Sequence, residues 1–89
     1  MAGGDMIVRE AIVMPVSMVP EGAVVEIVSF SQRSGRGFIQ KLSSMGIYPG
    51  AVIRVLRNQF PGPLIVDVMG TRIMLGHGMA NRIYVRIIR

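Results

Sequence analysis

The chain has 89 residues, is 51% hydrophobic and only 17% charged, which fits one small folded domain and excludes a disordered chain. Cysteine is absent, which excludes a disulfide framework, a thiolate metal site and a thiol nucleophile. No apolar run reaches membrane-spanning length and the first residues lack a basic signal-peptide region, so we expect a cytoplasmic protein without membrane insertion.

The net charge of +5 resides in the second part of the chain. Residues 1–50 carry four basic and four acidic side chains, whereas residues 51–89 carry six arginines and one aspartate. Such an excess suggests an acidic protein, a nucleic acid or an anionic membrane surface as partner. The arginines are interspersed among apolar residues, which favours the solvated outer face of strands over a dedicated basic patch.

The first residues and the remainder of the chain differ in pattern. We expect residues 1–14 to form a variable leader and residues 15–89 to form the domain. Within the leader, residues 6–8 and 11–13 carry a weak strand pattern that could add one extra strand.

The domain begins with a turn and a strand. Pro20 and Gly22 mark the turn. Residues 24–29 then alternate as a strand, with Val25 and Ile27 on one face.

A short helix is predicted over residues 37–45. Its apolar residues recur at helical spacing and include Leu42 and Met45. Ser34 is a candidate N-cap, and Gly46 stands where a helix C-terminus favours a residue that tolerates positive φ. Pro49-Gly50 then redirects the chain into the next strand.

Three further strands and a closing one complete the pattern, over residues 52–57, 64–69, 72–75 and 83–88. A tight hairpin turn is predicted at Gly70-Thr71. About five short strands and one helix, with turns at regular spacing, predict a mainly β fold, a small partly open barrel. Closure also protects the edges that an open apolar sheet would expose.

From Pro15 onward the chain resembles the FeoA family of small SH3-like barrel proteins. The strongest part of the match is Leu42-x-x-Met45-Gly46-Ile47-x-Pro49-Gly50-x-x-Ile53-x-Val55, flanked by Pro15-Val16-Ser17-Met18, Gly35-Arg36-Gly37, Gly62-Pro63-Leu64-x-Val66-x-Val68-x-Gly70 and Ile83-x-Val85. The resemblance implies a cytoplasmic, non-enzymatic regulator of ferrous iron uptake that docks on FeoB, a membrane transporter with a GTP-binding domain. The same fold is appended to metal-dependent transcription repressors.

Catalytic and metal-binding groups are sparse. The lone histidine, His77, lies between two glycines and is expected to be exposed, and the five carboxylates show no ligand spacing. We therefore predict no catalytic residue, no cofactor and no metal site within one chain, while an Fe²⁺ site shared between subunits stays open. Ser34-Gly35-Arg36-Gly37 lacks the spacing and the lysine of a phosphate-binding loop, which favours a plain loop.

Nucleic-acid binding, as a small β-barrel or transcription-regulator-like module, is the alternative function. Its support is the basic second half of the chain, and its weakness is that the five Phe and Tyr residues are scattered instead of alternating with arginine. The docking reading is preferred.

A partner-binding surface is predicted on the outer face of the strands, opposite the inward set around Val55 and Val66. Apolar side chains mixed with arginine at an exposed face are typical of protein interfaces, including those between copies of one chain. The candidate residues are Val52, Arg54, Leu56, Ile65, Met69, Arg72 and Met74. Coverage by the leader or the helix is the competing reading.

Overall fold

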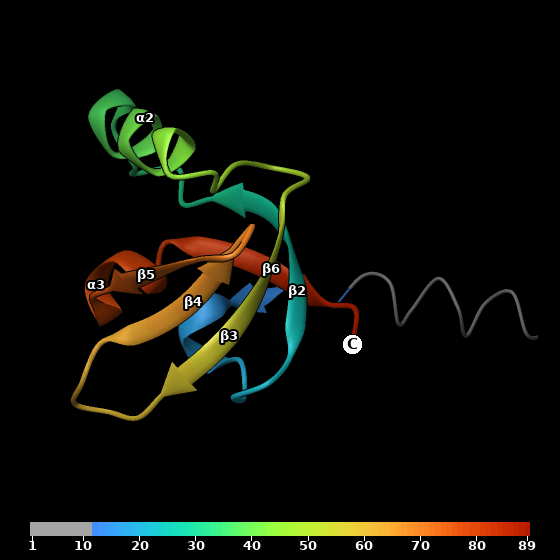
Figure 1. Ribbon diagram of the computed structural model, residues 1–89. Coiled ribbons are helices and arrows are strands. Elements are labelled where there is room, and N and C mark those ends of the chain that lie inside the picture. The colour runs from blue at the N-terminus through green and yellow to red at the C-terminus, as the bar shows by residue number, and fades with distance from the viewer. Residues whose placement is uncertain (1–11) are drawn as a thin grey trace, which may run out of the picture.

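The computed structural model describes residues 12–89, which form one antiparallel sheet curled into a partly open barrel with one main helix at its side (Figure 1). Its six strands follow the order β1-β6-β2-β3-β4-β5. The strands are β1 (Met14–Pro15), β2 (Val24–Phe30), β3 (Val52–Asn58), β4 (Leu64–Val68), β5 (Thr71–Leu75) and β6 (Ile83–Ile87). The helical segments are the 3-10 helix η1 (Val16–Met18), α2 (Arg36–Ser44) and the short α3 (His77–Ala80). The predicted fold class is confirmed.

The sheet has six strands where about five were predicted, and β1 is the additional one. Met14 pairs with Val85 and Pro15 with Tyr84 of β6. The extra strand therefore begins at Met14, because the described residues of the 11–13 segment are not in a strand. The other weak strand pattern, at residues 6–8, lies outside the described residues.

Helix α2 ends at the glycine that the sequence marks. The backbone N–H of Gly46 donates to the carbonyl of Ser43 at 3.0 Å, and that of Ile47 donates to Leu42 at 2.9 Å. This pair of bonds is a Schellman motif, in which the two residues of the outer bond, here Leu42 and Ile47, also make an apolar contact. Both Leu42 and Ile47 are fully buried, so the helix stop is tied into the core.

The start of α2 differs from the prediction. Gly35 occupies the N-cap position and no side chain caps the helix. Ser34 lies one residue earlier, and its buried hydroxyl finds no hydrogen-bond partner among residues 12–89. The N-cap prediction for Ser34 was therefore wrong, because the helix begins one residue later than a serine cap at that position would place it.

The core fills the barrel with aliphatic side chains. The predicted inward residues of β3 to β5 are buried, except that Ile73 packs on the core while partly exposed. Val24 is 5% exposed although it lies on the opposite face of β2 from Val25, so β2 buries more than one face. The fully buried large side chains include Val16, Val19, Val25, Ile27, Leu42, Ile47, Ile53, Val55, Leu64, Val66, Leu75 and Ile83.

Asn58, at the end of β3, joins the barrel to the segment that precedes β2. Its side-chain Nδ2 donates to the carbonyls of Ser17 at 2.9 Å and Val19 at 2.8 Å. Its backbone N–H donates to a carboxylate oxygen of Glu21 at 2.9 Å. Asn58 thus satisfies two backbone acceptors next to a fully buried residue, Val19.

Replacing Asn58 by alanine is expected to lower the free energy of unfolding by about 2 kcal/mol, because two carbonyls lose their donor. Asn58→Asp should cost at least as much, since a carboxylate would face the same two carbonyls. Urea unfolding followed by circular dichroism measures both. Gln59→Ala, one residue on and exposed, is the control and should change stability little. Equal stability of the Asn58 and Gln59 variants would contradict the role given to Asn58.

Candidate partner-binding face

The outer face of β3, β4 and β5 gathers most of the predicted surface residues in two cross-strand rows. One row is polar, because Arg54 pairs with Asp67 and Asp67 with Arg72. The other row is apolar and places Ile65 opposite Met74. Directly opposed residues on one face of a sheet have neighbouring side chains.

A β-bulge adds an arginine that strict alternation would place inside the barrel. The register between β3 and β4 shifts between Val55 and Arg57, so that Arg57 pairs with Ile65. Leu56 is the extra residue of the bulge, and such a residue re-aims the side chains that follow it. Arg57 therefore joins Leu56 on the outer face, and Asn58 turns inward to its carbonyl partners.

Two adjoining shallow hollows lie on this face. The first, of about 310 Å³, is lined by Leu56, Arg57, Ile65 and Arg72. The second shares Arg57 and Ile65 and continues over the loop from Gln59 to Pro63. We call the residues Arg54, Leu56, Arg57, Ile65, Arg72 and Met74 the arginine face. It combines three exposed arginines with half-buried Leu56 and Ile65, and with Met74, which is 69% exposed.

The loop beside the arginine face exposes an aromatic ring. Phe60 is 82% exposed, and its ring meets the imidazole of His77 edge to face at 5.3 Å between centroids. The Nε2–H of His77 donates to the carbonyl of Gly62 at 2.8 Å. His77 is half-buried, so the expectation of an exposed histidine was wrong: it joins α3 to this loop.

Two of the predicted surface residues lie apart from this group. Val52 is 48% exposed and pairs with Glu26 of β2, at the other end of β3. Met69 is 89% exposed and occupies the β4–β5 turn. It has a positive φ of 52° and is followed by Gly70 at 86°, the pair of conformations that a two-residue type I′ hairpin loop requires. The turn is thus Met69-Gly70, not Gly70-Thr71.

The arginine face has little opposing charge. Among residues 12–89, Arg86 and Glu26 form the sole ion pair, at 2.6 Å, and it lies on β6 and β2. Asp67 is the carboxylate that lies between Arg54 and Arg72, and its Oδ1 accepts the backbone N–H of Gly70 at 2.8 Å. The face therefore presents more positive than negative charge around its apolar centre.

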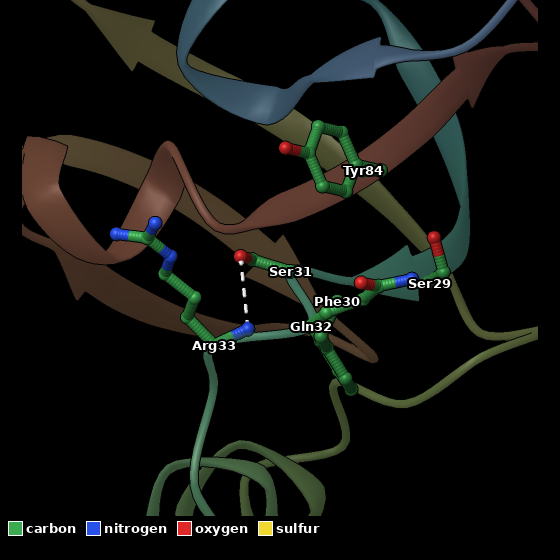
Figure 2. Close-up of a pocket in the computed structure, with 6 residues that line it drawn as sticks. All are labelled: Ser29, Phe30, Ser31, Gln32, Arg33 and Tyr84. Atoms are coloured by element: carbon green, nitrogen blue, oxygen red, sulfur yellow. Dashed lines mark hydrogen bonds between the residues drawn. The ribbon is translucent and has the colours of Figure 1, made fainter.

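A separate, more polar hollow lies at the end of β2. It is lined by Ser29, Phe30, Ser31, Gln32, Arg33 and Tyr84, and in Figure 2 Ser31 lies between the Tyr84 ring and the Arg33 side chain. The Ser31 hydroxyl accepts the backbone N–H of Arg33 at 3.3 Å. Hydroxyl groups and one guanidinium line a wide opening here, and no buried polar group converges on it.

Metal ligands do not converge in the described part of the chain. Over residues 12–89, no three His, Asp or Glu side chains lie close enough to hold an ion.

No helix within residues 12–89 has the length and hydropathy that crossing a membrane would require.

The chain is similar to proteins of one family along nearly its whole length. The FeoA domain family model matches residues 14–87. A curated relative from Methanocaldococcus jannaschii, provisionally named Fe(2+) transport protein A, is 38% identical over 71 residues, covering 80% of this chain and 83% of the relative. A crystal structure of an iron uptake regulatory protein (FeoA) superposes with a TM-score of 0.75 at 39% identity, covering 86% of this chain and 99% of that one.

The same fold occurs in larger proteins. A manganese-dependent transcriptional repressor superposes with a TM-score of 0.75 at 21% identity, over 85% of this chain and 42% of the repressor. That likeness concerns the fold alone. It agrees with the SH3-like barrel that the sequence predicts.

Proposed function

We propose, since the chain belongs to the FeoA family, that it serves ferrous iron uptake as a non-enzymatic docking module in the cytoplasm. Its partner is the cytoplasmic GTP-binding domain of a FeoB-type transporter. The names of the relatives, which refer to Fe(2+) transport and iron uptake regulation, support the process. The docking role is supported by a surface of this protein itself, the arginine face.

The arginine face is the observation that carries the docking role. It joins an apolar centre to a rim of three exposed arginines, with one carboxylate that the hairpin already engages. Protein interfaces combine a desolvated apolar centre with a polar rim and are enriched in arginine and methionine. A complementary partner would therefore present apolar side chains surrounded by acidic ones.

Met74→Asp is expected to weaken binding of the cognate transporter's GTP-binding domain about 100-fold, because it places a charge at the apolar centre of the face. Met18→Asp is the matched control: Met18 is 70% exposed and Met74 is 69% exposed, but Met18 lies on η1, outside the arginine face. Isothermal titration calorimetry with the full chain measures both variants. Equal loss in the two variants, or none in either, would count against the arginine face.

Nucleic-acid binding is the second candidate, and the exposed arginines at 54, 57 and 72 are the observation in its favour. It predicts a steep dependence of affinity on salt, because bound phosphates release counterions. Failure to bind the transporter domain, together with salt-dependent binding of a single-stranded RNA, would favour this second function. Isothermal titration calorimetry with the transporter domain and with the RNA, each at two salt concentrations, distinguishes docking on the transporter from nucleic-acid binding.

A further inference from the structure

The strand β5 is one of the two edges of the sheet. Over residues 12–89, no backbone hydrogen bond joins β5 to any element other than β4. Three of its five residues are exposed, and Ile73, which faces inward, is still partly exposed while its β4 partner Val66 is fully buried. No strand in this part of the chain therefore pairs with the outer side of β5.

The hairpin geometry tells which backbone groups point outward. In a two-residue hairpin the closing pair is hydrogen-bonded, here Val68 with Thr71, and hydrogen-bonded pairs then alternate with open pairs. The residues paired with Val68, Val66 and Leu64 therefore direct their backbone groups to β4. Arg72 and Met74 direct their backbone N–H and C=O groups to the open edge.

The two edges of the sheet differ in how they are protected. The opposite edge, β1, has two residues, and one of them is Pro15. Short edge strands and prolines discourage the addition of another strand. The β5 edge has five residues, no proline and no bulge in its pairing with β4. It retains the features of an edge that accepts a strand.

A hollow beside this edge offers room for side chains. It lies between the start of β5 and the end of α2, and it is lined mainly by apolar groups of Met45, Val68, Met69 and Ile73. On the other face of the strand stand Arg72 and Met74, both exposed. A strand added at β5 would point alternate side chains into the hollow and toward Arg72.

We propose that β5 is a docking edge for an extended segment of a partner protein, in which acidic and apolar residues alternate. Its backbone pairs with the open groups of Arg72 and Met74, its apolar side chains enter the hollow, and its acidic side chains face Arg72, the arginine nearest the edge. The excess of positive charge on the arginine face selects an acidic segment and opposes a second copy of this chain. The inference deepens the proposed function, on which it rests for the identity of the partner.

The test uses the full chain and a phage-displayed library of random dodecapeptides, so it does not depend on the transporter. We expect enriched peptides to alternate acidic and apolar residues. Addition of an enriched peptide should slow amide hydrogen exchange at Arg72 and Met74 about tenfold or more, because those N–H groups become bonded. No enrichment, basic peptides, or unchanged exchange at both amides would overturn the proposal.

Met74→Pro removes the outward N–H without removing a bond to β4, and Met74→Ala is the matched control that removes only the side chain. We expect the proline variant to bind the enriched peptide about tenfold more weakly than the alanine variant. Circular dichroism verifies that both remain folded, and Arg72→Pro provides a second variant at the other outward position. Equal affinities of the proline and alanine variants would show that the backbone edge is not used.

Three further outcomes separate the alternatives. A concentration-dependent dimer in analytical ultracentrifugation that Met74→Pro abolishes would overturn the proposal in favour of a second copy. Peptide capture at β5 without binding to the transporter domain would leave the edge site standing and count against the proposed function. If Met74→Pro left binding of that domain unaffected, the proposed function would stand and the docking role of the β5 edge would be overturned.

Discussion

Gly46→Ala is expected to lower the free energy of unfolding by about 3 kcal/mol. This value adds the strain of a left-handed backbone at a non-glycine residue to the cost of overpacking the core. Gly46 has φ of 88°, a conformation that alanine adopts only with strain. A Cβ at this position would also lie 2.8 Å from Cγ1 of Val68, which is 4% exposed. Val68 is β-branched and enclosed, so it has little room to move.

Gly50→Ala is the control that separates these two causes. Gly50 has a similar φ of 95°, but a Cβ there would meet nothing within 4 Å. Its substitution should cost only the backbone strain, about 1 kcal/mol. Chemical denaturation of the two variants gives the difference directly. The double variant Gly46→Ala/Val68→Ala should lose less stability than the sum of the losses of the two single variants, because the new Cβ no longer meets the Val68 side chain. Equal losses at the two glycines would contradict the close approach to Val68.

Leu42→Ala is expected to cost about 3 kcal/mol of stability, since it empties a fully enclosed site. Leu42 is 0% exposed and is the one buried residue of α2. Its backbone carbonyl also accepts the N–H of Ile47 at the helix end, and both side chains belong to the core. Loss of the side chain thus removes the one fully buried contact of α2 with the barrel and leaves the partly buried contact of Phe38.

Ile39→Ala is the comparison for Leu42→Ala on the same helix. Ile39 is 38% exposed, so its truncation should cost about 1 kcal/mol or less. Thermal unfolding followed at 222 nm gives both values. A loss at Ile39 as large as that at Leu42 would mean that the exposed face of α2 is in contact with something else.

The sequence predicts those parts of the fold that depend on short stretches of chain. The order Leu42, Met45, Gly46, Pro49, Gly50 specifies a helix end and a strand start, because each residue restricts its own backbone. Strand alternation predicts the buried faces of β3, β4 and β5 for the same reason. The N-terminal end of α2 was missed, because Ser34 has the chemistry of a cap but lies one position too early.

The candidate surface depends on pairing between strands and was therefore predicted in part. Leu56, Ile65 and Met74 fall on one face by alternation alone. Arg57 was missed because a bulge is a property of two paired strands, and alternation within the β3 sequence does not specify it. The open edge of β5 was missed because it depends on which strands close the barrel. An arginine at an inward position directly before Asn58 is the one local signal that alternation ends there.

The pairing of β6 with β1 and β2 implies an order of folding. The contacts within β3, β4 and β5 join neighbours along the chain, whereas Val25 pairs with Ile87 and Met14 with Val85. Long loops are entropically costly to close, and contacts distant in sequence slow folding. The meander of β3 to β5 is thus the expected folding nucleus, and closure by β6 the late step. During synthesis on the ribosome β2 is made before its partner β6, so its apolar side chains stay uncovered until the last strand emerges. In that interval the nascent chain is most prone to aggregation.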